Sequence, residues 1–168
     1  MPTDDGPELA IFVAMSLRSS EEESARSSER RTTGRIMVAP GQANGQHKPL
    51  ILVAEDHLDS REALSALLEA FGYKVIEAVD GREAVDLARR ARPDLILMDL
   101  MMPELDGFEA TRRIRAARET RETPIITVTA LSGARQLALD AGADDFIPKP
   151  IDSGRLVEKL ETLLGARD

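Results

Sequence analysis

Asp99 is the residue of this sequence with the clearest capacity for chemistry. It interrupts the apolar first half of the stretch Asp94–Gly107, which reads DLILMDLMMPELDG. A carboxylate near the end of a buried strand loses hydration, so it must be neutral or lie close to a cation or to hydrogen-bond donors. Taken alone, the pattern fits an acid that caps a loop as well as it fits a reactive group. The rest of the chain has to distinguish the two.

Polar residues stand at the ends of other apolar runs as well. Glu55 and Asp56 follow one run, Thr129 ends another, and Lys149 follows a third. Two like charges about 4 Å apart repel by about 4 kcal/mol at an effective dielectric near 20, so three carboxylates that meet in one place require a cation. Lys149 supplies one positive charge. Hard oxygen ligands with open positions also suit Mg²⁺, which readily takes a phosphate oxygen.

These residue types are the ones that phosphoryl transfer needs. A metal keeps an aspartate deprotonated, and a deprotonated aspartate is a competent nucleophile toward phosphorus. In-line transfer also requires charge to be neutralised on the equatorial oxygens, for which Mg²⁺, an ammonium and a hydroxyl are suitable groups. If the residues meet, Asp99 is a candidate phosphoryl acceptor, with Lys149 and Thr129 as candidate phosphate contacts.

Apolar runs and turn residues define the elements that must position these side chains. Short β-rich runs alternate with helical periodicity bounded by Gly, Pro and Asp. The expected strands are Leu50–Ala54, Tyr73–Val79, the first half of Asp94–Gly107, Pro124–Thr129 and Asp145–Pro148. The expected helices are a segment that follows His57–Ser60 and stops at Gly72, then Arg82–Arg92, a segment that follows Gly107 and runs through Arg118, Arg135–Ala141 and Asp152–Leu164.

Five strands alternating with five helices predict an α/β fold, namely a doubly wound, flavodoxin-like parallel sheet with helices on both faces. In such a sheet the ligand site lies at the carboxyl ends of the strands, near the point where the strand order reverses. With the order 2-1-3-4-5, the strand ends that carry Glu55, Asp99, Thr129 and Lys149 are neighbours. The fold therefore favours one shared pocket over an isolated structural acid at Asp99.

The composition is that of one aliphatic domain. The chain has 168 residues, 42% of them apolar, with no Trp, one Tyr and four Phe, so Ala, Leu, Ile and Val must build the core. A net charge of −8 argues against a nucleic-acid-binding surface over the whole domain, and we expect no direct nucleic-acid binding. The absence of Cys excludes disulfides, thiolate nucleophiles and Cys-zinc sites, and it permits the cytoplasmic location that we expect.

Residues 1–48 are predicted to be a disordered N-terminal leader, and residues 49–165 to form the domain. Ser16–His47 is rich in Ser, Glu, Arg, Gly and Gln, with too little apolar surface to offset the entropy of ordering it. Met37, just ahead of the ordered region, is an alternative translation start. The apolar stretch Leu9–Leu17 has nine residues where a bilayer needs about 20, so no membrane span is expected.

From Pro49 to Leu164 the chain resembles the receiver domain of the two-component response regulators. The motifs that carry this resemblance are Glu55-Asp56, MDLMMPELDG around Asp99, Thr129-Ala130, AGADDF at Ala141–Phe146, and Lys149-Pro150. Their order and spacing together are very specific. The chain is identified as a stand-alone receiver similar to the chemotaxis regulators, a group whose strand order is the one predicted above.

The resemblance implies a role for each matching residue. Asp99 is then the phosphoacceptor. The implied Mg²⁺ ligands are Glu55, Asp56, Asp99 and the main-chain carbonyl of Met101. The implied phosphate-binding and switch residues are Thr129, Ala130, Lys149 and Phe146, the last being an aromatic residue that moves with the threonine. Met101 and Leu131 stand at two further positions of the family pattern. Side chains at these positions influence the hydrolytic water and therefore the lifetime of the phosphoryl group.

The implied function is signalling by phosphorylation. A histidine kinase or a histidine phosphotransfer protein donates the phosphoryl group to Asp99, and the switch then changes the binding of a downstream protein partner. Such a protein is not an enzyme beyond its own Mg²⁺-dependent phosphorylation and dephosphorylation. It is expected to be a monomer or a phosphorylation-dependent dimer.

Two features depart from the family pattern. Glu55 stands where Asp is also common, which changes only the reach of the carboxylate. The interval from Thr129 to Lys149 is about two residues shorter than the pattern, and the loss falls within LSGARQLALDAG. We therefore expect an abbreviated fourth helix and a changed output face, which the fourth helix, fifth strand and fifth helix usually build.

Two other classes of function stay open at this point. An aspartyl-phosphate phosphohydrolase needs a second catalytic acid, but Met101 stands two residues after Asp99, where that acid belongs. A phosphorylation-independent interaction module does not need the acid site at all. We interpret His57 as a solvated loop residue that reaches at most the rim of the site. The arginines of the third helix are expected to lie mostly in solvent: Arg112, Arg113 and Arg115.

Overall fold

The computed structural model describes residues 48–166. The predicted N-terminal leader, apart from Lys48, and the alternative start at Met37 therefore lie outside the described residues. Within the described part, no helix is both long enough and apolar enough to cross a membrane.

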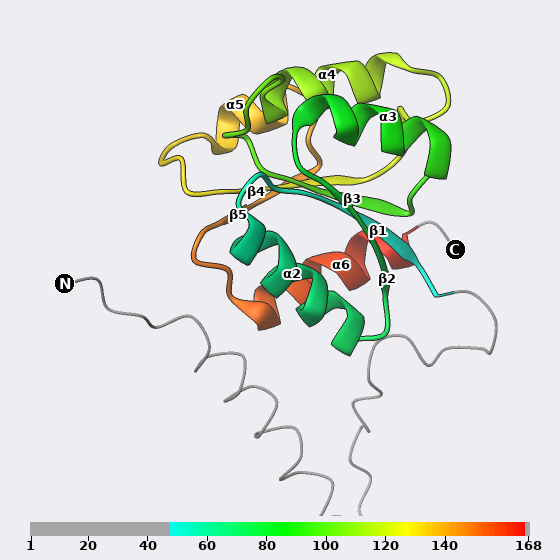
Figure 1. Ribbon diagram of the computed structural model, residues 1–168, viewed down its shortest axis with the longest axis vertical. Helices are drawn as coiled ribbons and strands as arrows, with labels where there is room; N and C mark the ends of the chain where they lie inside the picture. Colours follow the sequence, from blue (N-terminus) through cyan, green and yellow to red (C-terminus); the bar gives the residue numbers. More distant parts are fainter. Residues whose placement is uncertain (1–47, 167–168) are drawn as a thin grey trace, which may run out of the picture. The chain divides into compact units, whose positions relative to one another are not determined.

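A five-stranded parallel sheet forms the centre of the described part (Figure 1). Its strands are β1 (Leu50–Ala54), β2 (Lys74–Ala78), β3 (Leu95–Met98), β4 (Ile125–Thr129) and β5 (Asp145–Pro148). Their order is β2-β1-β3-β4-β5, so the predicted doubly wound sheet is confirmed. The order reverses between β1 and β3, which is where ligands bind in sheets of this kind.

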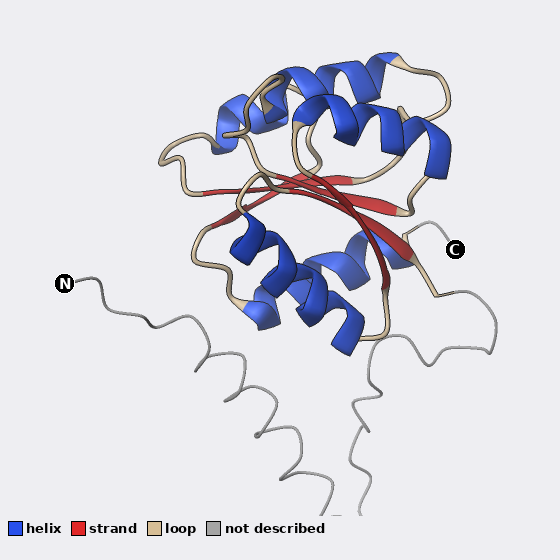
Figure 2. Cartoon of the chain, viewed as in Figure 1, coloured by secondary structure: helices blue, strands red, loops and turns tan. Residues whose placement is uncertain are grey.

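Helices cover both faces of the sheet, as Figure 2 shows. They are α2 (Leu58–Ala70), α3 (Gly81–Ala91), α4 (Gly107–Ala116), α5 (Arg135–Asp140) and α6 (Ser153–Gly165). α3, α4 and α5 lie on one face, and α2 and α6 lie on the other. This arrangement leaves the carboxyl ends of the strands to be lined by loops rather than by helix faces.

Each face of the sheet has its own apolar core, because successive residues of a strand point to opposite sides. In β3, Ile96 packs with the cluster under α3, α4 and α5, while Leu95 and Leu97 pack with the cluster under α2 and α6. All three are at most 1% exposed. Burial on both sides explains why β1, β3 and β4 read as continuous apolar runs in the sequence.

Three aspartates determine where helices begin. Asp80, Asp106 and Asp152 each accept a hydrogen bond from the main-chain N–H three residues later, at 2.8, 2.9 and 2.7 Å respectively. Each side chain thereby satisfies one of the N–H groups that have no partner within the helix. As a result α3 begins at Gly81 and α6 at Ser153, each one residue away from its predicted start.

The C-terminal end of α4 differs from the prediction. The helix ends at Ala116 because the next residue is extended, with φ −84° and ψ 128°. Arg115 in its last turn was expected to lie in solvent, but its guanidinium donates to the main-chain oxygens of Gly142 at 2.7 Å and Thr123 at 2.6 Å. It also pairs with Asp144 at 2.6 Å. Arg115 therefore ties the loops that precede β4 and β5 to α4.

The predicted fourth helix corresponds to α5, and it is short, as expected. It has six residues, Arg135–Asp140. Gly133 precedes it with φ +74° and Gly142 follows it with φ +108°, and both values lie in the region that favours glycine. Leu137 of this helix is 58% exposed. The face formed by α5, β5 and α6 is thus built on a helix of fewer than two turns.

Gly107, the first residue of α4, lies where no side chain fits. Its N–H donates to the main-chain oxygen of Leu100 at 3.0 Å. A Cβ at this position would lie 2.0 Å from the carbonyl oxygen of Asp99, closer than any real contact of this kind. The neighbour is backbone, not the flexible end of a side chain, so the segment that follows β3 would have to move.

We expect Gly107→Ala to lower the free energy of unfolding by about 1–3 kcal/mol, the usual cost of forcing extra atoms into a packed region. Urea denaturation at pH 7 measures the change. Gly154→Ala is the matched control, because Gly154 also lies in the first turn of a helix and its added Cβ would meet only Asp152 Oδ1, at 3.4 Å. Equal stability of the two variants would contradict the role given to Gly107.

Candidate functional site

Lys149, which follows β5, joins two strand ends that are far apart in the sequence. Its Nζ donates to Asp99 Oδ2 at 2.8 Å and also to Glu55 Oε2, partners that are 50 and 94 residues away. Burial lowers the pKa of Lys149, but the hydrogen bonds and the negative charges of Asp99 and Glu55 outweigh burial and raise it above the ordinary value. The ammonium is therefore charged at neutral pH and is the counter-ion of both carboxylates.

Asp99 lies directly after β3 and is only 5% exposed. Its main-chain N–H donates to the oxygen of Ala54 at 2.9 Å, which fixes it beside the end of β1. Its carboxylate oxygens have different partners: Oδ1 accepts from the N–H of Met101 at 3.0 Å, and Oδ2 accepts from Lys149. The carboxylate is thus held in one orientation at the point where the strand order reverses.

Glu55, Asp56 and His57 form the loop after β1. Glu55 is 3% exposed, and its Oε1 accepts from the main-chain N–H of His57 at 3.2 Å. Asp56 is partly exposed, and its Oδ1 lies 3.1 Å from Nδ1 of the solvated His57 ring. One ligand atom from each of the three residues falls within 4.8 Å of the others. The carboxylate oxygens are hard donors, so this end of the site suits a cation such as Mg²⁺.

Thr129 ends β4 and is 1% exposed. Its main-chain oxygen accepts from the N–H of Lys149 at 3.0 Å, which aligns the ends of β4 and β5. Its hydroxyl oxygen accepts from the N–H of Leu131 at 3.3 Å. The hydroxyl hydrogen has no acceptor among the described residues and can be donated to another group.

The remaining predicted site residues lie around these polar groups. Met101 is 59% exposed and Leu131 is 37% exposed, so both present apolar side chains to solvent after Asp99 and Thr129. Ala130, between Thr129 and Leu131, is exposed. Phe146, in β5, is partly buried and packs against the core cluster under α3, α4 and α5.

Arg61 was not predicted, although it contacts the site from α2. It is 8% exposed, and its Nη1 donates to the main-chain oxygen of Glu55 at 2.8 Å. The sequence did contain a signal: Arg61 shares a helix face with the buried residues Leu64, Ser65 and Leu68, at helical spacing. An arginine on an apolar face must find buried partners, but the sequence alone does not name them.

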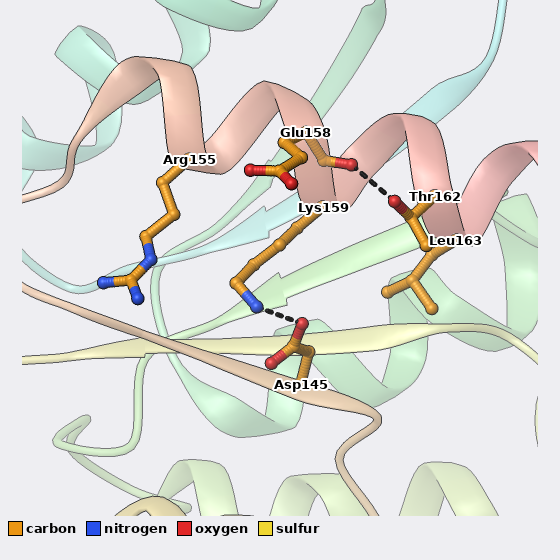
Figure 3. A pocket seen from close by; sticks show the side chains of 6 residues that line it. All are labelled: Asp145, Arg155, Glu158, Lys159, Thr162 and Leu163. Atoms are coloured by element: carbon orange, nitrogen blue, oxygen red, sulfur yellow. Dashed lines mark hydrogen bonds and ion pairs between the residues drawn. The ribbon is translucent and has the colours of Figure 1, made fainter.

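A pocket lies between β5 and α6, and neither Glu55, Asp56 nor Asp99 lines it (Figure 3). Its lining residues are Asp145, Arg155, Glu158, Lys159, Thr162 and Leu163. The ammonium of Lys159 pairs with Asp145, and the Thr162 hydroxyl donates to the main-chain oxygen of Glu158 at 2.8 Å. Asp145 begins β5 whereas Lys149 follows its end, so the pocket includes none of the predicted site residues.

Comparison with known sequences identifies the family. A model of the response regulator receiver domain matches residues 51–161. Response regulator MprA of Mycolicibacterium vanbaalenii is 43% identical over 116 residues, which are 68% of this chain and 49% of MprA. The polar-differentiation response regulator DivK of Brucella anthropi is 38% identical over 117 residues, 68% of this chain and 95% of DivK. The chain therefore spans about half the length of MprA and nearly all of DivK.

Solved structures agree with the sequence matches. The receiver domain of the sensor histidine kinase PA1611 from Pseudomonas aeruginosa, which has magnesium coordinated in its active site cleft, is 40% identical with a TM-score of 0.67 over 71% of this chain and 99% of that one. The chemotaxis protein CheY4 of Vibrio cholerae is 31% identical with a TM-score of 0.66 over 70% and 99%. Fold, motifs and sequence agree, and this chain belongs to the response regulator receiver family.

Proposed function

We propose that this receiver works in a two-component system and that Asp99 accepts the phosphoryl group. The observation that carries this proposal is the state of the Asp99 carboxylate. It is nearly buried, oriented by Met101 and Lys149, and neighboured by further carboxylates at the end of β1. A purely structural acid does not need that surplus of negative charge, whereas a nucleophile that binds its phosphate together with a cation does.

The transfer step forms one bond and breaks one. An oxygen of Asp99 attacks the phosphorus of a phosphohistidine, the bond between phosphorus and imidazole nitrogen breaks, and its electron pair stays on the imidazole. Lys149, 2.8 Å from the carboxylate, then balances negative charge on the phosphoryl oxygens. The donor is a histidine kinase or a histidine phosphotransfer protein.

The proposed Mg²⁺ ligands are the carboxylates of Glu55, Asp56 and Asp99 and the carbonyl of Met101. The donor set fits this ion, since all of these ligands are hard oxygens and the site has no cysteine. When bound, Mg²⁺ neutralises charge on the phosphoryl oxygens during transfer. Lys149 occupies one oxygen of Glu55 and one of Asp99, so it shares the task of charge neutralisation with the ion.

Thr129, Ala130, Lys149 and Phe146 are the proposed phosphate-binding and switch residues. The hydroxyl of Thr129 is available to donate to a phosphoryl oxygen. Phe146, partly buried in the neighbouring strand β5, is the aromatic side chain proposed to move together with Thr129. The switch would thereby alter the surface that a downstream protein partner contacts. We further propose that residues 49–165 form the signalling domain and that it works in the cytoplasm, as a monomer or as a phosphorylation-dependent dimer, without direct nucleic-acid binding.

Phosphorylation of Asp99 can be tested with acetyl phosphate and Mg²⁺. The protein is expected to take up one phosphoryl group, measured by intact mass, and Asp99→Asn is expected to take up none because an amide is not a competent nucleophile. Asp86→Asn is the matched control, as Asp86 is an exposed acid of α3. Undiminished labelling of Asp99→Asn would exclude the assignment, and turnover of phosphomonoesters would favour a phosphohydrolase instead.

The apolar side chains of Met101 and Leu131 are expected to prolong the life of the phosphoryl group. Met101→Gln combined with Leu131→Asn offers hydrogen bonds to an attacking water, and one bond worth about 1 kcal/mol accelerates hydrolysis about fivefold. Decay of the labelled protein, followed by mass spectrometry after removal of the donor, measures the rate. Leu137→Asn, on the exposed side of α5, is the control. Equal or slower decay in the double variant contradicts the prediction.

Lys149→Met leaves Glu55 and Asp99 without their counter-ion. We expect the free energy of unfolding at pH 7 without divalent ions to fall by about 2 kcal/mol, less than the ~3–5 kcal/mol for a fully buried pair because solvent reaches the lysine. Mg²⁺ is expected to recover part of this loss. Urea denaturation measures both effects, with Lys74→Met, an exposed substitution on β2, as the control.

The pH dependence of the same variant tests the raised pKa of Lys149. A raised lysine pKa means that the stabilisation is fully present below the ordinary value of 10.5 and is lost only as the pH rises beyond it. The difference in stability between the unsubstituted protein and Lys149→Met should therefore be the same at pH 7 and at pH 9. A difference that shrinks over this interval speaks against the raised pKa.

A further inference from the structure

Arg61 is a buried cation that contacts the acidic loop without contacting its carboxylates. It lies in the first turn of α2, and its side chain is 9% exposed. Nη1 donates to the main-chain oxygen of Glu55 at 2.8 Å and lies 3.5 Å from that of Asp56. The guanidinium therefore binds both peptide groups that carry the two acids of this loop.

A second group of contacts keeps Arg61 in this position. Its Nε donates to Glu77 Oε2 at 3.2 Å, and the hydroxyl of Ser65 donates to Glu77 Oε1 at 2.5 Å. Glu77 belongs to β2, and Ser65 lies one turn after Arg61 in α2. Both oxygens of Glu77 are thus engaged, and β2 and α2 together hold the guanidinium against the loop.

We infer that Arg61, oriented by Glu77 and Ser65, is a positioning residue that aims the carboxylates of Glu55 and Asp56 at the metal. This inference rests on the proposed function, because it takes these two acids as ligands of Mg²⁺. The physical reason lies in the main chain: fixing the two carbonyls fixes the peptide planes, and these planes set the directions in which the side chains leave the loop. Hydrogen bonds from a charged donor are stronger than those between neutral groups, so they can hold the two peptide planes in place.

A purely electrostatic role for Arg61 predicts the opposite result. If its charge were what mattered, removing it would make the site more negative and bind a divalent cation more tightly. Because Glu77 pairs with Arg61, it offsets most of the positive charge of the guanidinium, and the electrostatic effect of Arg61 on a bound cation is small. Positioning predicts weaker binding instead, because the two carboxylates lose their fixed direction. The sign of the change separates the two roles.

The first experiment measures metal binding directly. Mn²⁺, which accepts the same oxygen ligands, is titrated into the protein, and the free ion is followed by electron paramagnetic resonance, with Mg²⁺ as the competitor. Arg61→Met is expected to bind about tenfold more weakly, the lower end of the range for losing a group that orients a metal ligand. Arg112→Met is the matched control, since Arg112 is exposed and pairs with Glu109 in its own helix.

The second experiment separates positioning from general damage. In labelling by acetyl phosphate, Arg61→Met should require about tenfold more Mg²⁺ for half-maximal rate, yet reach the unsubstituted rate at saturating Mg²⁺. Arg61→Lys can donate to a carbonyl but lacks the forked guanidinium that reaches Glu77 as well. Its Mg²⁺ requirement should therefore fall between those of the unsubstituted protein and Arg61→Met. Glu77→Gln leaves Arg61 unsubstituted but removes the charge of its partner. This variant should also weaken Mn²⁺ binding, by less than Arg61→Met does.

Each outcome decides a different point. Unchanged or tighter Mn²⁺ binding by Arg61→Met overturns the inference, and so does a labelling rate of Arg61→Met that stays low at saturating Mg²⁺. If the unsubstituted protein binds neither Mn²⁺ nor Mg²⁺, the metal site itself is wrong, and that part of the proposed function fails together with the inference. If the unsubstituted protein binds Mn²⁺ and Arg61→Met binds it equally well, the proposed function stays intact and only the role of Arg61 is removed.

Discussion

The ammonium group of Lys149, held between Glu55 and Asp99, is the interaction on which the rest of the site depends. The two acids are 3% and 5% exposed, and carboxylates removed from water at neighbouring strand ends repel each other. Lys149 offsets this repulsion by donating to both. Its main-chain N–H donates to Thr129 at 3.0 Å, so the pairing of β4 with β5 fixes where the ammonium can reach. Charge balance and sheet register therefore constrain each other.

The loops that carry the acids are held through their main chains. Gly107 allows the first turn of α4 to approach the carbonyl of Asp99, and Arg61 reaches the carbonyl of Glu55 from α2. In both cases the contact is with a peptide group, which leaves the carboxylate oxygens to Lys149 and to other ligands. Both faces of the sheet thus contribute: α4 supports the end of β3 from one side, and α2 supports the end of β1 from the other.

Much of the fold was predictable from the sequence, because strands buried on both sides read as continuous apolar runs and parallel strands need a helix between them. The short α5 followed from the interval between Thr129 and Lys149. The meeting of the strand ends followed from strand order alone. The hydrogen-bond partners of long side chains were harder to predict. Arg61 and Arg115 both donate to main-chain carbonyls, and a helical pattern does not reveal which carbonyl a long side chain will contact. The close approach at Gly107 depends on tertiary packing and left no separate signal.

The separation of 94 residues between Glu55 and Lys149 has a consequence for folding. Contacts between distant parts of a chain close a long loop, and this loop entropy must be overcome before the contacts contribute stability, so such contacts tend to form late. A molecule in which β1 and β3 have paired but β5 has not docked carries Asp99 without its lysine. The ability proposed for Asp99, to accept a phosphoryl group, is then a property of the completed sheet. On this proposal, partly folded molecules do not compete with native ones for a phosphodonor.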